Sequence, residues 1–359
     1  MRKMTPPERI MAVLRGQPVD RVPFTAYPGD PRPIDETIDF LGKENIGFTS
    51  AGYPYKIEHP GCTVKEETYE QGGEKLKKVV TETPKGNLEE LYRFDPTFES
   101  EWHVEFPIKT PEDYDIYSEM MENAIITENY EEFEKEKAEF SEIGHLMAWT
   151  GRSPYQRLAI KLVGLMNLGL HLMDCPEKVE RAMEAMREAH RKIMKIIIGS
   201  SAEIVNIGDN INAPMVGLER FEKYCVPLYN ETVEMLEGTD KLVFVHMDGS
   251  LRPLRDAISR CKHHVVESFC CIPDGDVSIA EAVEWWPDKI IWPNFTSSIH
   301  LCEPKVIREH ADMILNEGAP SGRLLIGLME NIPPFAWKKS LPPIVQAIED
   351  YGEPAAHEK

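Results

Sequence analysis

From residue 145 onward, short apolar runs alternate with longer segments whose apolar residues recur at helical spacing. The run 241–245 (KLVFV) has the length and the β-branched residues of a buried strand, whereas residues 175–198 repeat their apolar positions every three to four residues. Further strand-like runs are 145–149, 202–208, 263–268, 289–294 and 323–328. Strands that alternate with helices pair in parallel, so this part of the chain predicts an α/β fold.

The beginning of the chain predicts a helix that leads into a short strand. Thr5 is suited to cap this helix, Pro6 suits its first turn, Glu8 completes a capping box, and Gly16 ends it. Residues 19–24 (VDRVPF) then predict a turn into a strand.

Residues 62–94 have a different pattern, with three extended segments of alternating polarity. Gly72-Gly73 and the Pro-Lys-Gly sequence at 84–86 separate these segments, which predicts a β-meander. We expect the meander to decorate the main fold rather than to form a domain of its own.

The number of strand–helix repeats favours a single domain over 1–359, a closed (β/α)8 TIM barrel with the meander as an N-terminal insertion. The sequence contains no GxGxxG or GxxxxGK[ST] fingerprint, which argues against a nucleotide-binding open sheet.

Charge and cysteine content narrow the class of protein. The net charge of −21 repels a phosphate backbone, so nucleic acid is not an expected partner. The acidic run 128–142 predicts a solvated helix face. Seven cysteines without CxxC spacing do not form a disulfide framework and suit a reducing compartment.

The N-terminus lacks the features of a signal peptide, and the apolar run 193–198 is too short to span a bilayer, so we expect a cytoplasmic protein.

Polar residues follow the predicted strands, where a barrel builds its active site. They would therefore converge on one mouth and predict a functional site there. The residues concerned are Thr150-Gly151-Arg152, Asp209-Asn210, His246, Asp248, Gly249, Glu267, Asn294 and Glu330-Asn331.

Four of these residues have the chemistry of a metal site. His246, Glu267 and Glu330, with Asp248 nearby, form an acceptable zinc set that leaves one position open for substrate. The alternative is a hydrogen-bonded network of histidine and carboxylates without metal, and the residues alone leave both alternatives open.

Aromatic residues near the predicted mouth are Tyr27, Trp149, Tyr155 and Phe295. Each taken alone is explained by packing, but together they suit a flat, apolar substrate.

Several segments, in this order, resemble proteins of the uroporphyrinogen decarboxylase-like superfamily. They are the opening 5–24 (TPPERIMAVLRGQPVDRVPF), 151–159 (GRSPYQRLA), 207–210 (IGDN), 245–249 (VHMDG), 292–295 (WPNF) and 327–334 (GLMENIPP). The resemblance implies a (β/α)8 barrel.

The decarboxylase branch of this superfamily carries an arginine-containing motif after the first strand. Here the corresponding segment, 25–33 (TAYPGDPRP), contains only Arg32. A substrate with four carboxylates needs several bidentate cations, so decarboxylation of a tetrapyrrole is not expected.

The corrinoid-dependent methyltransferase branch carries His-x-Cys-Gly after one strand and a further cysteine near the last, and these bind zinc. The matching positions here are His246, Asp248 and Glu330, so both thiolates are replaced by carboxylates. An oxygen-rich site is a harder Lewis acid that matches an oxygen substrate. The resemblance thus implies an O-demethylase component that moves a methyl group from a methyl ether, which we expect to be aromatic, to cob(I)alamin.

The chain has no DxHxxG corrinoid-binding signature, so the cobalamin is expected on a separate corrinoid protein, docked at the meander or the acidic helix. The expected catalytic residues are His246, Glu330, Asp209, Asn210 and Tyr155, the substrate contacts are Tyr27, Trp149, Asn294 and Phe295, and the zinc ligands are His246, Glu330, Glu267 and Asp248.

Two other functions stay open. One is a metal-independent decarboxylase of a small organic acid, in which Asp209 and Tyr155 would act. The other is a non-catalytic protein that binds a corrinoid or a small molecule. The sequence also leaves the oligomeric state open, with a homodimer as one alternative.

Overall fold

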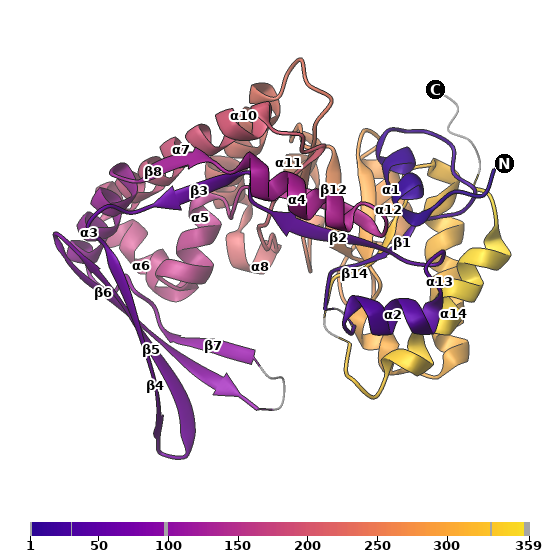
Figure 1. Cartoon of the computed structure of the whole chain (residues 1–359), viewed down its shortest axis with the longest axis horizontal. Coiled ribbons are helices and arrows are strands. Elements are labelled where there is room, and N and C mark those ends of the chain that lie inside the picture. The colour runs from indigo at the N-terminus through magenta and orange to yellow at the C-terminus, as the bar shows by residue number, and fades with distance from the viewer. Residues whose placement is uncertain (1, 30, 97–99, 331, 355–359) are drawn as a thin grey trace. The chain divides into compact units, whose positions relative to one another are not determined.

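The computed structural model describes the whole chain except residues 1, 30, 97–99, 331 and 355–359. The chain divides into two compact units. Unit 1 comprises Met1–Pro54, Tyr130–Gly151 and Ser200–Lys359, and unit 2 comprises Tyr55–Asn129 and Arg152–Gly199. Figure 1 labels the elements of both units.

Unit 1 contains a closed parallel barrel, which confirms the predicted (β/α)8 TIM barrel. Around the barrel the strands follow the order β1-β14-β13-β12-β11-β10-β9-β2. Their bounds are β1 Phe24–Ala26, β2 Gly47–Gly52, β9 Gly144–Trp149, β10 Ile204–Ile207, β11 Leu242–His246, β12 Val265–Cys270, β13 Ile290–Asn294 and β14 Ile326–Leu328. All barrel strands run in the same direction, so their carboxyl ends share one mouth.

The helices of unit 1 include those expected after the later strands. They are α1 Pro6–Leu14, α2 Ile34–Leu41, α4 Tyr130–Phe140, α8 Ala213–Val216, α9 Leu218–Arg220, α10 Val226–Met235, α11 Arg255–Ser259, α12 Ile279–Trp285, α13 Pro304–Gly318 and α14 Trp337–Tyr351. Helix α1 begins as predicted, because the Thr5 hydroxyl accepts from Glu8 N and the Glu8 carboxylate accepts from Thr5 N. The acidic run forms α4, in which Phe133 is buried.

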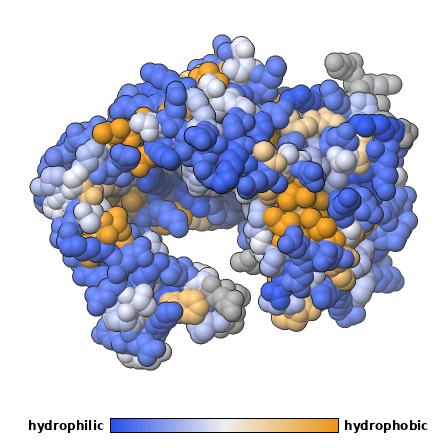
Figure 2. Space-filling model, in the orientation of Figure 1, coloured by the Kyte–Doolittle hydropathy of each residue, from blue (hydrophilic) through white to orange (hydrophobic). Residues whose placement is uncertain are grey.

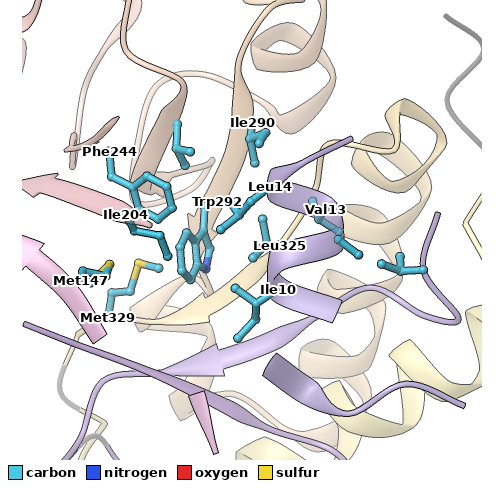
Figure 3. Close-up of a cluster of buried hydrophobic side chains, with 13 residues drawn as sticks. Ile10, Val13, Leu14, Met147, Ile204, Phe244, Ile290, Trp292, Leu325 and Met329 are labelled. Atoms are coloured by element: carbon cyan, nitrogen blue, oxygen red, sulfur yellow. The ribbon is translucent and has the colours of Figure 1, made fainter. Parts of the chain in front are cut away.

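Helix α1 packs against the amino-terminal part of the barrel, opposite the mouth. Figure 3 shows Ile10 and Leu14 of this helix beside Trp292 and Leu325, within one cluster of buried side chains. Residues at the starts of β10, β12 and β13 join the same cluster, namely Ile204, Val265 and Ile290. This end of the barrel is therefore filled by hydrophobic packing.

The strand β2 was not predicted, because its sequence GFTSAG lacks a dense run of large apolar residues. Its glycines allow neighbouring side chains to pack closely against the backbone. A Cβ atom added at Gly52 would lie 2.6 Å from Leu146 Cδ2, and one added at Gly47 would lie 2.9 Å from Ile10 Cδ1. The strand β2 is therefore held by close packing of neighbouring side chains on its backbone rather than by large apolar residues of its own.

Unit 2 contains the predicted meander, which has one strand more than expected. The antiparallel sheet β4-β5-β6-β7 is formed by Thr63–Gln71, Glu74–Thr83, Gly86–Asp95 and Ser100–Glu105. Figure 1 shows the β4–β5 turn extending away from the helices of the same unit. The other elements are the pair β3 Tyr55–Glu58 and β8 Ile125–Glu128, and the helices α3 Pro111–Glu122, α5 Pro154–Arg157, α6 Leu165–Asp174 and α7 Pro176–Gly199.

A groove of about 850 Å³ lies on unit 1 between α2, β2 and α4. Figure 2 shows hydrophobic surface beside α2. Apolar side chains such as Ile34, Phe140 and Leu146 line the groove together with the carboxylates of Glu136 and Glu139. None of the strand-end residues singled out above belongs to its lining. Among the helices of the described residues, none is both long and apolar enough to cross a membrane.

Candidate functional site

Three side chains meet at the mouth of the barrel. His246 is the last residue of β11, Asp248 follows it by two residues, and Glu330 follows β14 by two residues. One ligand atom of each lies within 4.8 Å of the other two. His246 and Asp248 are half-buried and Glu330 is exposed, so the cluster connects the barrel interior to solvent.

A second layer of polar contacts lies around the imidazole of His246. Its Nδ1 atom is 2.8 Å from Glu267 Oε2, and the two residues are paired across β11 and β12. The Tyr27 hydroxyl donates to the other oxygen of Glu267, whose side chain is fully buried. A carboxylate oxygen accepts hydrogen bonds, so this contact assigns a hydrogen to Nδ1, which donates it to Glu267. Nε2 is then the ring nitrogen that is available to a ligand.

The site is strongly acidic, and this charge acts on His246. Burial alone would lower the pKa of its imidazole, but the carboxylates of Glu267, Asp248 and Glu330 oppose this effect. The net result is a pKa for His246 above the ordinary value of 6.5. The cluster therefore favours a positive charge, whether a proton on the imidazole or a bound cation.

Asp209 and Asn210, which follow β10, have different surroundings. Asn210 Nδ2 donates to Asp248 Oδ2 at 3.4 Å, which links it to the cluster. Asp209 is fully buried and accepts a hydrogen bond of 2.5 Å from the Tyr229 hydroxyl of α10. Burial and the neighbouring carboxylate raise the pKa of Tyr229 well above its ordinary value, so this phenol stays a donor.

Trp149 ends β9 and is half-buried at the mouth. Its ring lies directly over Gly208, where an added Cβ would come within 1.7 Å of Trp149 Cη2. A glycine is therefore required at 208 for the indole to adopt this position.

The strand β12 contains a bulge beside Glu267. The register against β13 shifts between Glu267 and Phe269, and Ser268 has a left-handed φ of 58°. With Ser268 as the extra residue, Cys270 returns to the side of the strand occupied by Glu267. Burial raises the pKa of the Cys270 thiol to about 12, and the charges of Asp248 and Glu330 act in the same direction. The neighbouring Cys271 is buried beside Thr296 and His310.

The remaining predicted residues are buried in the barrel, belong to unit 2 or fall outside the described residues. Asn294 is buried and links β13 to β14, because its Oδ1 accepts from Met329 N at 2.8 Å. Phe295 is fully buried and its ring contacts those of His300 and His310. Tyr155 is buried in α5 of unit 2. Asn331 lies outside the described residues.

Sequence reasoning missed three residues of this region: Gly208, Tyr229 and Cys270. Gly208 stands inside the IGDN segment, so its position after a strand was a usable signal. Tyr229 lies on the helix α10, where nothing in the pattern sets it apart from core residues. Cys270 could not be singled out among the seven cysteines, because the bulge that brings it to the side of β12 occupied by Glu267 cannot be seen in the sequence.

Comparison with known proteins agrees with this fold. Residues 152–351, more than half of the chain, match the family described as uroporphyrinogen decarboxylase (URO-D). A methyltransferase from Methanosarcina mazei has a similar structure, with a TM-score of 0.58 and 12% sequence identity over 97% of this chain and 99% of that one. A B12-independent methionine synthase from Shewanella sp. W3-18-1 has a TM-score of 0.44 and 8% identity over 83% of this chain and 76% of that chain. No curated protein matches the sequence.

Proposed function

The chain belongs to the uroporphyrinogen decarboxylase family, and from that premise we propose that it is a methyltransferase. The methyl group would come from a methyl ether, which we expect to be aromatic. The acceptor would be the cob(I)alamin of a separate corrinoid protein. The observation that carries this proposal is the cluster of His246, Asp248 and Glu330 at the mouth of the barrel.

The cluster fits a metal ion. It offers one imidazole nitrogen and two carboxylates within 4.8 Å of one another, and zinc accepts this donor set. The carboxylates of Glu267, Asp248 and Glu330 surround His246 and favour a cation in the site. Bound here, a divalent ion would supply Lewis-acid activation of an oxygen atom.

The proposed reaction requires a group that stabilises the oxygen as it leaves. In the proposed reaction the methyl C–O bond breaks, the cobalt donates its electron pair to the methyl carbon, and the ether oxygen leaves as an alkoxide or phenoxide. Cobalt is thereby oxidised from Co(I) to Co(III). An alkoxide is a poor leaving group unless it is protonated or coordinated. A metal ion held by the cluster would coordinate this oxygen. In a site without metal, a protonated Glu330, the exposed group of the cluster, would instead donate a proton to it.

Trp149 supports an aromatic substrate. Its indole is half-buried at the strand ends, over Gly208, and so offers a flat apolar surface near the cluster. Planar rings stack on such surfaces in an offset or edge-on arrangement. A polycarboxylate substrate is disfavoured, since Asp248, Glu267 and Glu330 already surround His246 with negative charge.

The name of the structurally similar Methanosarcina mazei protein, a methyltransferase, agrees with the reaction class. The test is formation of methylcobalamin when the purified protein is mixed with a reduced corrinoid protein and a methoxyarene. We expect the phenol and methylcobalamin to appear in equal amounts. If neither forms across a panel of methyl ethers, the proposed donor class is wrong.

A further inference from the structure

Tyr27 spans the mouth of the barrel from a strand that is not adjacent to the one it contacts. It directly follows β1, whereas its hydroxyl donates to Glu267 on β12, and β14 and β13 lie between these two strands around the barrel. The side chain therefore reaches across the barrel interior. Its ring packs against the hydrophobic cluster that contains Trp292 and Met329.

Glu267 in turn joins Tyr27 to His246. One carboxylate oxygen accepts from the Tyr27 hydroxyl, and the other lies 2.8 Å from His246 Nδ1. The carboxylate is fully buried, so its orientation is set by these two contacts and by the packing of β12. With both oxygens engaged, the Glu267 side chain is fixed as an acceptor for the imidazole.

We propose that Tyr27 is a positioning residue, which holds Glu267 so that His246 keeps its hydrogen on Nδ1 and turns Nε2 toward Asp248 and Glu330. Only the catalytic importance of this arrangement rests on the proposed function. Tyr27 is then not a substrate contact but a residue that orients the site. Glu267 is not a metal ligand but accepts a hydrogen bond from His246, which is one. Carboxylates that accept from a metal-binding histidine set its tautomer and raise its basicity.

The hydrophobic contacts of Tyr27 add a second consequence. Because the ring rests on the cluster and the hydroxyl stays at the site, Tyr27 couples the position of Glu267 to the packed part of the barrel. Removing only the hydroxyl keeps this packing, since phenylalanine has the same ring. Tyr27→Phe therefore isolates the hydrogen bond.

The first arm of the test observes His246 directly in protein labelled with ¹⁵N-histidine, with His246→Ala used to assign its signals. In the metal-free wild type, recorded at a pH above the raised pKa of His246 so that the ring is neutral, we expect the ¹⁵N shifts of a ring with hydrogen on Nδ1. In Tyr27→Phe we expect this state to mix with the other tautomer. In Glu267→Gln the amide can donate to Nδ1, so we expect the hydrogen to move to Nε2. A tautomer that is unchanged in Tyr27→Phe would overturn the proposal, and Glu267→Gln shows that the measurement detects a change.

The second arm measures zinc affinity by competition with a chelator. Loss of a hydrogen bond that a metal-binding histidine donates weakens metal binding by about 10–100-fold. Tyr27 acts one contact further out, through Glu267, so we expect Tyr27→Phe to lose zinc affinity by about 10-fold, the lower end of this range. Tyr117→Phe is the matched control, because Tyr117 is a buried phenol of α3 in unit 2. Equal zinc affinity in Tyr27→Phe, Tyr117→Phe and the wild type would contradict the assignment. Neither arm needs methyl transfer, so a wrong methyl donor would leave both results standing.

Discussion

His246 and Glu267 face each other across the adjacent strands β11 and β12, with Nδ1 and Oε2 2.8 Å apart. His246 belongs to the cluster with Asp248 and Glu330 at the mouth, and Glu267 is fully buried behind it. A buried carboxylate needs hydrogen-bond partners, and His246 and Tyr27 supply them. The pair therefore links the stability of the barrel to the chemistry at its mouth.

The first prediction concerns pH and the metal-free protein. The folded protein raises the pKa of His246 above the ordinary value of 6.5. Protonation of His246 therefore stabilises the folded protein. This stabilisation is fully present below pH 6.5, the pKa in the unfolded chain, and is lost as the pH rises through the higher pKa of the folded protein. Compared with His246→Gln, the wild type should gain free energy of unfolding as the pH falls through this window. Urea unfolding of both proteins across the window is the measurement, and a difference that grows with rising pH would contradict it.

The second prediction concerns the support of Trp149. Gly208→Ala places a methyl group 1.7 Å from the indole and forces the ring to move. We expect a loss of about 1–3 kcal/mol in the free energy of unfolding, the usual cost of overpacking, and a higher KM for a methoxyarene. Thermal unfolding and steady-state kinetics measure the two effects.

Gly169→Ala is the control for this substitution. An added Cβ at Gly169 meets nothing within 4 Å, and the residue lies inside helix α6. This variant should be stabilised by up to about 1 kcal/mol, because alanine favours the helix. If Gly208→Ala behaves like Gly169→Ala, the interpretation of the Trp149 position is wrong.

The third prediction concerns the pair of Tyr229 and Asp209. Tyr229→Phe removes the donor of a 2.5 Å hydrogen bond to a fully buried carboxylate. Loss of one partner from a buried hydrogen bond costs about 1–3 kcal/mol, so the variant should unfold at lower denaturant concentration. Chemical unfolding with an unchanged m-value tests this. Stability equal to that of the wild type would indicate that other contacts alone hold Asp209.

Much of the barrel could be predicted because its later strands are short apolar runs between amphipathic helices. The strands at 204–207, 242–246 and 290–294 lie where the pattern put them. The strand β2 could not be predicted from its own residues. Its glycines are needed because side chains from distant segments, such as α1 and β9, pack directly against its backbone.

The meeting of three polar side chains at the mouth could also be predicted from the positions of the strands. His246, Asp248 and Glu330 follow strands, and parallel strands bring their carboxyl ends together. The contact of Tyr27 with Glu267 could not be read in this way, because it depends on the reach of one side chain across the barrel. The bulge at Ser268, with its left-handed φ of 58°, likewise has no sequence signal, since no glycine marks it.

Metal content is the most direct measurement of the site itself, because the proposed activation of the ether oxygen depends on His246, Asp248 and Glu330 acting together. The purified wild type should hold one zinc ion per chain, while His246→Ala and Glu330→Gln should lose it. Glu330 is exposed, so Glu330→Gln should change the free energy of unfolding of the metal-free protein by less than about 0.5 kcal/mol. Zinc retained equally in all three proteins, or absent from all three after supplementation, would contradict a metal centre at the mouth of this barrel.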